Sequence, residues 1–348
     1  MKAIQINKPG DISPIDIPQP VLKAGEVLIK VCYAGFCGSD LNTYRGGNAL
    51  AKMPVIPGHE IGGVIVDVGS NVSDSQLNEN FSIGLPCTVN PYTACGTCSS
   101  CRNGRPNACR FNQTLGVQRD GAMCEYIAVP REKVIADPEI SPKDFCLVEP
   151  LSVGFHAVRR GEVTVHDVVM VIGCGMIGIG AIAGAIQRGA SVIAVDIDDN
   201  KLLLAKQLGA TYTINSLTNN VHDRLQTITE NTGSDVVIEA VGSPATYQMA
   251  VNEVAFTGRV VCIGYAKEQV AFETRYFVQK ELDIRGSRNA MPEDFRAVME
   301  YLKKGDCPVE KFISAIYPPA QVVEAFRHWT ANPARTLKIL IEFASTDN

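Results

Sequence analysis

Residues 168–196 read VVMVIGCGMIGIGAIAGAIQRGASVIAVD. An apolar, β-branched run leads into GCGMIG at residues 173–178, a segment of small and apolar residues follows, and a second apolar run ends at Asp196. The pattern predicts a strand, a glycine turn, a helix and a second strand. An acidic residue 18 positions after the last glycine makes this arrangement typical of a dinucleotide-binding unit. The alternative is an ordinary strand-helix-strand unit with a glycine turn and no ligand.

Each position of the glycine motif has its own physical task. Gly173 permits the tight turn, Gly175 lets the backbone approach a pyrophosphate, and Gly178 lets the helix pack on the strand. Met176 and Ile177 open the helix, where unpaired N–H groups attract phosphate. The stretch therefore predicts a Rossmann domain that binds a dinucleotide.

Other residues indicate which cofactor is bound and where its reactive ring lies. Asp196 is placed to accept hydrogen bonds from the adenosine ribose, and its charge would repel a 2′-phosphate, so NAD is favoured over NADP. Three further apolar segments, DVVIEAVG, GRVVCIGY and ELDIRGS, predict more strands of a doubly wound parallel sheet. Val241, Ile263 and Gly264 end two of these segments and are candidates for contact with nicotinamide or ribose, the alternative being that they are only buried strand residues.

Composition limits the classes of protein to which the chain can belong. Its 348 residues, 46% of them hydrophobic, suit two domains with a core each. The 32 basic and 37 acidic residues form no charged blocks, so neither nucleic acid nor membrane is an expected partner. The first residues, MKAIQINKPG, contain no apolar signal core, which favours a cytoplasmic protein.

Two groups of potential metal ligands precede the glycine motif. Cys37 and the pair His59-Glu60 lie in loops beside predicted strands, and zinc accepts sulfur, nitrogen and oxygen ligands of these types. Taken alone, Cys37 and His59 are equally well explained as buried structural residues.

The second group is a cluster of cysteines in a polar loop, formed by Cys95, Cys98, Cys101 and Cys109. Four thiolates close a tetrahedron around zinc and leave no open position, so we expect this site to be structural and not catalytic. Disulfides are one alternative, which an oxidising compartment would favour. An iron–sulfur cluster is another, because four cysteines also ligate that cofactor.

The order of these motifs carries a family resemblance. CGSD begins at residue 37, GHE at residue 58 and EPLS at residue 149, all ahead of the dinucleotide motif. This arrangement resembles the zinc-containing medium-chain dehydrogenases, the superfamily of alcohol, polyol and threonine dehydrogenases, over essentially the whole chain. The resemblance implies an α/β protein in which a GroES-like, β-rich catalytic domain is interrupted in sequence by a doubly wound Rossmann domain.

We accordingly expect residues 1–147 and 287–348 to form the catalytic domain, with a structural zinc lobe at about residues 87–112. Residues 148–286 would form the NAD-binding domain, with a helix over residues 151–160 ahead of its first strand. The resemblance further implies a homodimer or a homotetramer.

The resemblance also implies two zinc ions per chain, one catalytic and one structural. Cys37 and His59 would bind the catalytic zinc with either Glu60 or Glu149 as the third protein ligand, since members of the family are described both ways. A zinc ion there would act as a Lewis acid that helps a substrate hydroxyl lose its proton before hydride passes to NAD. Glu60 and Glu149 are therefore candidate ligands and candidate proton carriers.

Proton transfer to solvent would begin at Ser39, where the family carries a relay hydroxyl; a turn hydroxyl is the alternative. Asp40 is expected to orient the histidine ligand. Many relatives have a histidine three residues after the relay hydroxyl, whereas this chain has Asn42, which does not titrate near neutral pH. The outer relay then requires water, a glutamate or another route.

The substrate class is predicted from weaker signals. The segments YRGGN, EPLSVGFHAVRR and GSRNAMPEDF most resemble bacterial dehydrogenases that oxidise C5 of L-galactonate or L-gulonate. Because a guanidinium pairs bidentately with carboxylate, Arg45, Arg119 and Arg288 are candidates for recognising such a sugar acid. For Arg288 the alternative is contact with the cofactor or with a subunit surface.

Other functions remain as alternatives. A neutral polyol such as sorbitol, and then threonine, would use the same chemistry. A non-catalytic NAD-binding sensor or a zinc-free quinone reductase is disfavoured, because both would be expected to lack a catalytic metal ligand, and Cys37, His59, Glu60 and Glu149 are all present.

Overall fold

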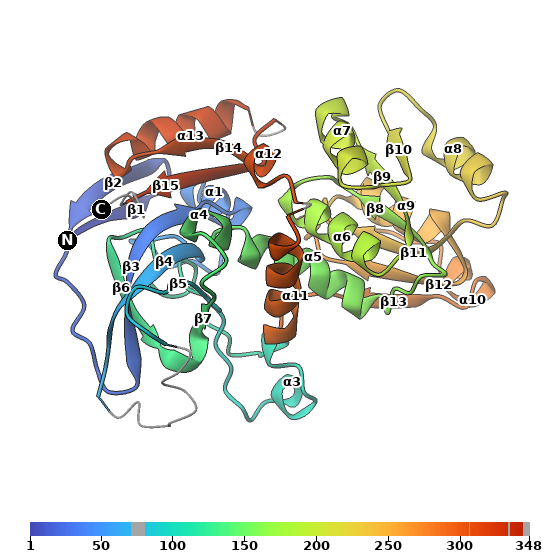
Figure 1. Cartoon of the computed structure of the whole chain (residues 1–348). Helices are drawn as coiled ribbons and strands as arrows, with labels where there is room; N and C mark the ends of the chain where they lie inside the picture. Colours follow the sequence, from blue (N-terminus) through green and yellow to red (C-terminus); the bar gives the residue numbers. More distant parts are fainter. Residues whose placement is uncertain (71–80, 306, 333–334, 344–348) are drawn as a thin grey trace. The chain divides into compact units, whose positions relative to one another are not determined.

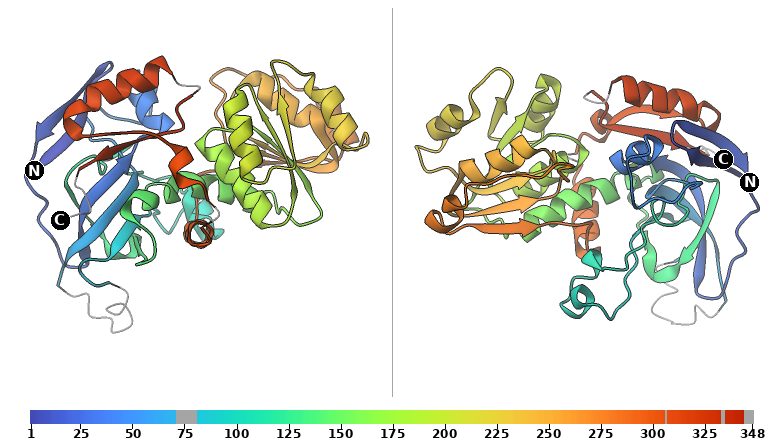
Figure 2. Two further views of the ribbon diagram at one scale, coloured as in Figure 1. Left: turned by 45° about the horizontal axis from the view of Figure 1, so that its top comes forward. Right: turned by 180° about the vertical axis from the view of Figure 1, so that it is seen from behind.

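A computed structural model gives the structure of the chain (Figure 1) and describes residues 1–70, 81–305, 307–332 and 335–343. The chain divides into two compact units. Unit 1 comprises residues 1–150 and 302–348, and unit 2 comprises residues 151–301. Figure 2 shows the ribbon from two further directions.

Unit 1 is built on a seven-stranded sheet in which β3 (Glu26–Gly35) has the central place. β3 pairs antiparallel with β4, β6 and β15, so the end of the chain lies beside a strand from its beginning. The path through the sheet is β14-β15-β3-β4-β5-β7, and β1 and β2 form a separate hairpin. The other strands are β1 (Lys2–Lys8), β2 (Asp11–Asp16), β4 (Glu60–Val68), β5 (Pro86–Val89), β6 (Tyr126–Pro130), β7 (Val134–Ala136), β14 (Ile313–Tyr317) and β15 (Lys338–Glu342).

Short helices join and cover these strands (Figure 1). They are α1 (Gly38–Tyr44), α3 (Ser99–Arg102), α4 (Pro142–Phe145), α12 (Val309–Phe312), α13 (Val322–Ala331) and the 3₁₀ turns η1 (Pro106–Ala108), η2 (Arg131–Lys133) and η3 (Pro319–Gln321). Phe36, Phe326 and Trp329 form an aromatic cluster between β3 and α13, with the rings of Phe36 and Phe326 edge to face at 4.6 Å. The core of unit 1 thus joins the two ends of the chain.

Unit 2 contains a six-stranded parallel sheet in the order β10-β9-β8-β11-β12-β13. The strands are β8 (Val168–Ile172), β9 (Ser191–Asp196), β10 (Tyr212–Asn215), β11 (Ser234–Glu239), β12 (Val254–Cys262) and β13 (Asp283–Gly286). The helices between them are α6 (Met176–Gln187), α7 (Asp199–Gln207), α8 (Val221–Ile228), α9 (Pro244–Glu253) and α10 (Arg275–Gln279), and Figures 1 and 2 show helices on both faces of the sheet. The strand order reverses direction between β8 and β11, which is where doubly wound folds bind ligands.

The second boundary between the units differs from the one expected at residues 286–287. It lies at residues 301–302, because α11 (Pro292–Lys303) is tied to α5 (Val148–Arg160) by a buried carboxylate. Asp294 accepts a hydrogen bond from Arg159 Nε at 2.8 Å and lies 2.8 Å from His156 Nδ1. These contacts keep most of α11 with the nucleotide-binding sheet.

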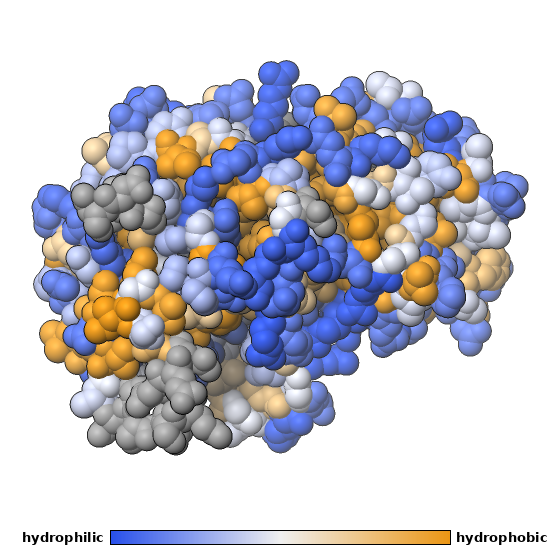
Figure 3. Space-filling view, in the orientation of Figure 1, coloured by the Kyte–Doolittle hydropathy of each residue, from blue (hydrophilic) through white to orange (hydrophobic). Residues whose placement is uncertain are grey.

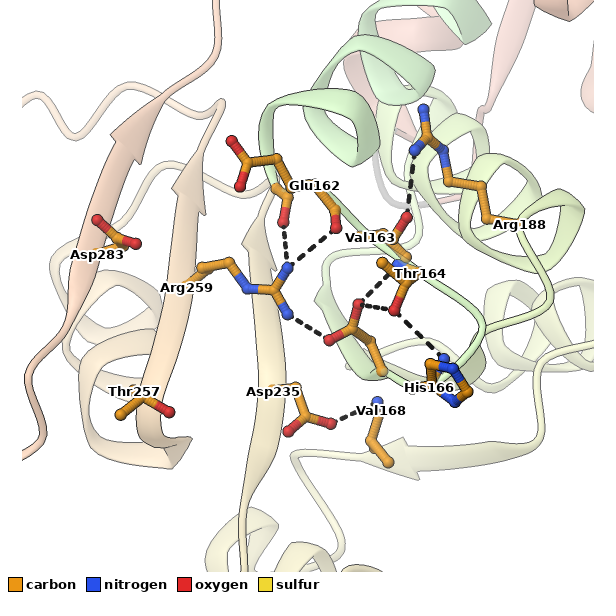
Figure 4. A network of polar contacts seen from close by, with 12 residues as sticks. Glu162, Val163, Thr164, His166, Val168, Arg188, Asp235, Thr257, Arg259 and Asp283 are labelled. Carbon is orange, nitrogen blue, oxygen red and sulfur yellow. Dashed lines mark hydrogen bonds and ion pairs between the residues drawn. The ribbon is translucent and has the colours of Figure 1, made fainter.

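A polar network fixes the amino edge of that sheet (Figure 4). Arg259 on β12 donates to the carbonyl oxygens of Gly161 and Glu162 at 2.9 and 3.0 Å and forms an ion pair with Asp167. Asp235 at β11 accepts the N–H of Val168 at 2.7 Å. These hydrogen bonds and the ion pair therefore hold the segment before β8 against β11 and β12. This edge of the sheet is opposite the glycine turn.

On the face drawn in Figure 3, hydrophilic and hydrophobic side chains are interspersed. Among the described residues, no helix is both long enough and apolar enough to cross a membrane.

Candidate active site and metal centres

The first candidate metal group brings together residues from two segments of unit 1. One ligand atom each of Cys37, His59 and Glu60 lies within 4.8 Å of the others. Cys37 is the N-cap of α1, and its N–H donates to Asp40 Oδ2 at 2.8 Å. These contacts place a half-buried sulfur beside a histidine and a glutamate that are almost completely buried.

The turn before β4 positions His59. Gly58 has a φ of +102°, and a Cβ there would lie 2.8 Å from Met123 Cγ, so only glycine fits without rearrangement. The backbone of the 121–123 segment binds this turn, with N–H groups of Ala122 and Met123 donating to the carbonyls of Gly58 and Pro57, each at 2.9 Å. The backbone that carries the His59 imidazole is therefore held in one position.

The donor set fits a metal cation. Burial alone would lower the pKa of His59, but the negative charges of Cys37, Asp40 and Glu149 raise that pKa well above its usual value. His59 Nδ1, Asp40 Oδ1 and Ser39 Oγ are buried and lack hydrogen-bond partners within the described structure. A pocket with excess negative charge, unpartnered polar atoms and sulfur, nitrogen and oxygen donors matches the ligand preferences of zinc.

Glu60 is bound by a buried lysine from the other end of the chain. Lys338 Nζ lies 2.6 Å from Glu60 Oε1 and 2.5 Å from Oε2, and it also donates to the Phe36 carbonyl at 2.9 Å. Burial alone would lower the pKa of Lys338, but the charge of Glu60 raises it. Gly35 leaves room for the pair, since a Cβ at that position would stand 2.3 Å from Glu60 Oε2.

Glu149 has a neutral partner instead. It lies in the first turn of α5, outside the group of three ligand atoms, and accepts a short hydrogen bond from the buried Tyr92 hydroxyl. Burial raises the pKa of Glu149, against the opposing effect of the His59 charge. Both predicted glutamates thus lie close enough to influence each other's charge, one bound to an ammonium and the other to a phenol.

The predicted relay residues lie on α1. Asp40 is fully buried, and burial raises its pKa to about 6. Its expected hydrogen bond to His59 is not formed: Asp40 Oδ2 holds the Cys37 N–H, and the other oxygen has no partner among the described residues. Asn42 Oδ1 faces the turn after the helix, 2.5 Å from where a Cβ of Gly47 would stand. Ser39 Oγ is buried and makes no hydrogen bond in the described structure, so it is available to bond to a substrate hydroxyl.

The four cysteines of the second group also meet. All four sulfur atoms lie within 4.8 Å of one another, with Cys98 Sγ 3.5 Å from Cys101 Sγ and 3.7 Å from Cys109 Sγ. None of the twelve cysteines forms a disulfide in the structure, which contradicts the disulfide alternative. Sulfurs about 2.3 Å from a tetrahedral zinc are about 3.8 Å apart, whereas the four cysteines of an iron–sulfur cluster are divided among two or more irons, so that all four do not surround one metal ion.

Hydrogen bonds from backbone N–H groups favour the thiolate form of these cysteines, which is the form that binds a metal cation. N–H groups of Cys95 and Phe111 donate to Cys109 Sγ, each at 3.3 Å, and the Cys98 N–H donates to Cys95 Sγ at the same distance. The Ser100 hydroxyl, together with backbone N–H groups, lowers the pKa of Cys98 to about 5. Thiolates bound by backbone N–H groups are suited to a closed zinc site.

The glycine motif has the geometry of a dinucleotide site. Gly173 has a φ of +94°, and a Cβ on Gly178 would lie 1.8 Å from the Gly173 carbonyl. Around Gly175, the N-cap of α6, the space that a Cβ would enter is open, which suits close approach of a pyrophosphate. Met176 and Ile177 form the first turn of α6. Asp196 accepts N–H groups from Cys174, Ile197 and Asp198 at 2.6 to 3.0 Å, which fixes its carboxylate at the end of β9.

Two family models match the chain. Residues 23–139 match the alcohol dehydrogenase GroES-like domain, and residues 177–304 match the zinc-binding dehydrogenase domain. The chain is 31% identical to the L-galactonate-5-dehydrogenase of Escherichia coli K12 over 93% of its own length and 94% of that protein. It is 32% identical to the sorbitol dehydrogenase of Bacillus subtilis over 98% and 97% of the two chains.

The chain belongs to the zinc-type alcohol dehydrogenases. The crystal structure of an alcohol dehydrogenase from E. coli CFT073 with NADH covers 99% of both chains, with a TM-score of 0.89 and 31% identity. The family has a GroES-like and a Rossmann-type domain, as predicted from the sequence, and its members act on CH–OH groups.

Three further positions of this dehydrogenase end strands of the nucleotide unit. Val241 follows β11 and is half exposed, and a Cβ on Gly173 would lie 2.6 Å from its side chain. Ile263 and Gly264 follow β12 and are partly buried. All three stand at the carboxyl edge of the sheet, and Val241 lies beside the glycine turn.

The three candidate arginines differ in their surroundings. Arg45 ends α1 and is exposed. Arg119 is partly buried, and its guanidinium donates to the carbonyls of Gln113 and Pro91 at 3.2 and 3.5 Å. Arg288 is partly buried in unit 2, between β13 and α11.

Sequence reasoning missed two residues of the dehydrogenase site, Lys338 and Tyr92. The signal for Lys338 is a cation within the apolar segment TLKILIEF, where a buried strand position requires a partner. Tyr92 has only a weak signal, its place three residues before Cys95.

Proposed function

We propose that this zinc-type dehydrogenase transfers hydride from a secondary hydroxyl of a sugar acid, L-galactonate or L-gulonate at C5, to NAD. The reaction converts the alcohol and NAD⁺ into a ketone, NADH and a proton. The observation that carries the sugar-acid assignment is the environment of Arg119.

Arg119 is a partly buried cation that forms no ion pair with a carboxylate among the described residues. Among the residues that the structure describes, its side chain bonds only to carbonyl oxygens, and burial lowers its pKa. Its loop also packs on the turn that positions His59: a Cβ on Gly116 would lie 2.4 Å from Gly58 N. A guanidinium in such a place supports recognition of a carboxylate on a bound substrate.

The cofactor assignment is supported by Asp196. Its carboxylate already accepts three backbone N–H groups, so it is held in place and cannot turn away from a 2′-phosphate. The resulting repulsion favours NAD over NADP. Among relatives, one solved structure was determined with NADH and another, at 28% identity, with NADP.

The protein's own groups would handle the proton. Zinc bound at Cys37 and His59 would supply Lewis-acid polarisation of the substrate oxygen. Ser39 Oγ, buried and unpartnered in the described structure, would accept the hydroxyl proton and pass its own proton on toward solvent. Lys338 holds Glu60, and Tyr92 holds Glu149, so each carboxylate keeps its orientation as the proton leaves.

Purified protein should be mixed with NAD and, separately, with L-galactonate, L-gulonate, sorbitol and L-threonine, while absorbance at ~340 nm is followed with and without a zinc chelator. Chelator-sensitive turnover of the hexonates supports the proposal. Turnover of sorbitol or threonine alone would support the zinc-dependent hydride transfer but contradict the sugar-acid substrate. Silence with every compound would favour the sensor alternative.

The Arg119→Met variant sharpens the test. Loss of charged hydrogen bonds worth about 1.5 to 3 kcal/mol predicts a fall of roughly 10- to 100-fold in kcat/KM for the hexonates. Any residual turnover of sorbitol should be unchanged, and Arg45→Met serves as the comparison at an exposed position. Equal losses for acid and neutral substrates would contradict carboxylate recognition by Arg119.

We also propose that the protein forms a homodimer or homotetramer and has only small molecules as ligands, with no nucleic acid or membrane partner. Sedimentation of the purified chain tests the assembly.

A further inference from the structure

Glu239, the last residue of β11, is a buried carboxyl group at the carboxyl edge of the nucleotide-binding sheet. Its side chain is completely buried. The edge where β11 stands next to β8 is the point at which the strand order reverses, so residues that follow β11 line the crevice where a dinucleotide binds. Glu239 therefore lies directly beneath the wall of the proposed cofactor site.

One oxygen of Glu239 organises that wall. Oε1 accepts the N–H groups of Val241 and Gly242 at 2.9 and 2.7 Å and the Thr246 hydroxyl at 2.8 Å. Three donors converging on one oxygen are the arrangement that stabilises a carboxylate. The negative charge is thus held by the turn and by the first residues of α9.

The other oxygen has no partner. Oε2 is buried and makes no hydrogen bond within the described structure. It stands 2.9 Å from the position that a Cβ of Gly264 would take. Among the described residues, no lysine, arginine or histidine forms an ion pair with Glu239. A buried charge without a counter-ion projects its field into the neighbouring crevice, because little solvent screens it.

The turns that follow β11 and β12 pack tightly against each other around Glu239. Glu239's own carbonyl accepts the Ile263 N–H at 2.9 Å, and a Cβ on Gly242 would lie 2.6 Å from Tyr265 N. The turns after β11 and β12 therefore pack backbone against backbone around this carboxyl group. Its distance from a cofactor in the crevice is fixed by the fold.

We propose that Glu239 sets which oxidation state of the cofactor binds more tightly. This inference rests on the proposed NAD function. The nicotinamide ring carries a positive charge in NAD⁺ and none in NADH, so an unpaired negative charge beside the crevice strengthens binding of the oxidised form and eases release of the reduced form.

The test measures equilibrium binding of NAD⁺ and NADH separately, without substrate, to the wild type and to Glu239→Gln. Glutamine keeps the size and the acceptor oxygen and removes the charge. The ratio Kd(NAD⁺)/Kd(NADH) should rise up to about tenfold, because the substitution removes an electrostatic attraction that acts on the oxidised form alone. A purely structural role would weaken both affinities by the same factor.

Glu253→Gln is the matched control. Glu253 is also a buried glutamate of unit 2, but it ends α9 at the opposite, amino edge of the sheet and pairs with His222 at 2.9 Å. Neutralising it should leave the ratio unchanged. If Glu239→Gln does not fold, Glu239→Asp and Glu239→Asn form a second pair of equal size that differs only in charge, with the same expected ratio.

The outcomes separate the two proposals. Wild-type protein that binds neither form would overturn the NAD assignment itself. Wild-type protein that binds both, with a ratio that Glu239→Gln leaves unchanged or that Glu253→Gln alters equally, would overturn only the role of Glu239.

Discussion

Substitution of Lys338 by methionine should destabilise unit 1 strongly. The side chains are similar in length, but methionine removes the ammonium that contacts both oxygens of Glu60 and the Phe36 carbonyl. Both charged side chains are at most 3% exposed, so solvent cannot replace the lost partner. Breaking a buried ion pair from one side costs about 3 to 5 kcal/mol, because the remaining charge stays buried and uncompensated.

The structure supplies the probe for this measurement. Trp329 is the only tryptophan of the chain, and its ring lies 6.3 Å from that of Phe36, whose carbonyl accepts from Lys338. Its fluorescence during urea unfolding therefore reports on unit 1, which avoids averaging over two units that need not unfold together. The free energy of unfolding should be compared in the metal-free protein, so that zinc binding does not enter the result.

Two further variants decide whether the ion pair is the cause. The double variant Lys338→Met with Glu60→Gln removes both charges and should recover to within about 1 to 2 kcal/mol of the wild type, since a neutral buried pair carries no uncompensated charge. Lys143→Met breaks the pair with Glu310, which is 78% exposed at the glutamate, and should cost less than about 1 kcal/mol. A loss below about 1 kcal/mol for Lys338→Met, or no recovery in the double variant, would refute the reasoning.

Three other substitutions probe the remaining contacts. Cys98→Ser should lower the zinc content by one ion per chain in elemental analysis; retention of two ions would contradict a four-thiolate site. Tyr92→Phe should weaken metal binding at the other site about 10- to 100-fold in chelator competition, and unchanged affinity would show that Glu149 is not a ligand. Asp294→Asn should cost about 2 to 4 kcal/mol near neutral pH. Burial raises the pKa of Asp294, but its hydrogen bonds lower it overall. Its contribution is therefore present above the ordinary carboxyl range and disappears as the pH falls below it, so by circular dichroism the variant's deficit should shrink below about pH 4.

Local spacing explains which parts of the site could be predicted. The glycine motif and the cysteine lobe are encoded within short segments, since Gly178 packs on the Gly173 carbonyl and Cys98 meets Cys101 within one turn. Such contacts follow from chain geometry, whatever the rest of the fold does. The Rossmann unit and the meeting of the four sulfurs could therefore be predicted from residue order alone.

Contacts between strands that are distant in sequence could not be predicted from residue order. Lys338 meets Glu60 across 278 positions of sequence, and this depends on β15 pairing with β3 in a register that places Leu340 opposite Gly35. A shift of one residue would turn Lys338 to the other face of the sheet. The pattern of TLKILIEF shows a strand, but it does not show which strand lies beside it.

The start of α5 is a smaller difference of the same kind. A helix was expected from residue 151, whereas it begins at Val148 and includes Pro150. Proline is tolerated in the first turn, where its missing N–H would have no helical partner. The difference places Glu149 on the helix itself, so its carboxylate is aimed by α5 and not by a loop.

The two buried glutamates together explain why a lysine is needed in the pocket. If Glu149 is the third ligand, it and Cys37 would offer two negative charges, which one divalent cation would balance. Burial raises the pKa of Glu149, as expected for a carboxyl group whose cation is not part of the chain. Glu60 would add a third charge to the same buried space. In that arrangement Lys338 would neutralise Glu60, which could then lie beside Cys37 and His59 without drawing on the charge of the metal. The cost of removing Lys338 should therefore fall on the stability of unit 1 and on the charge balance at the metal, which the unfolding and metal-competition measurements separate.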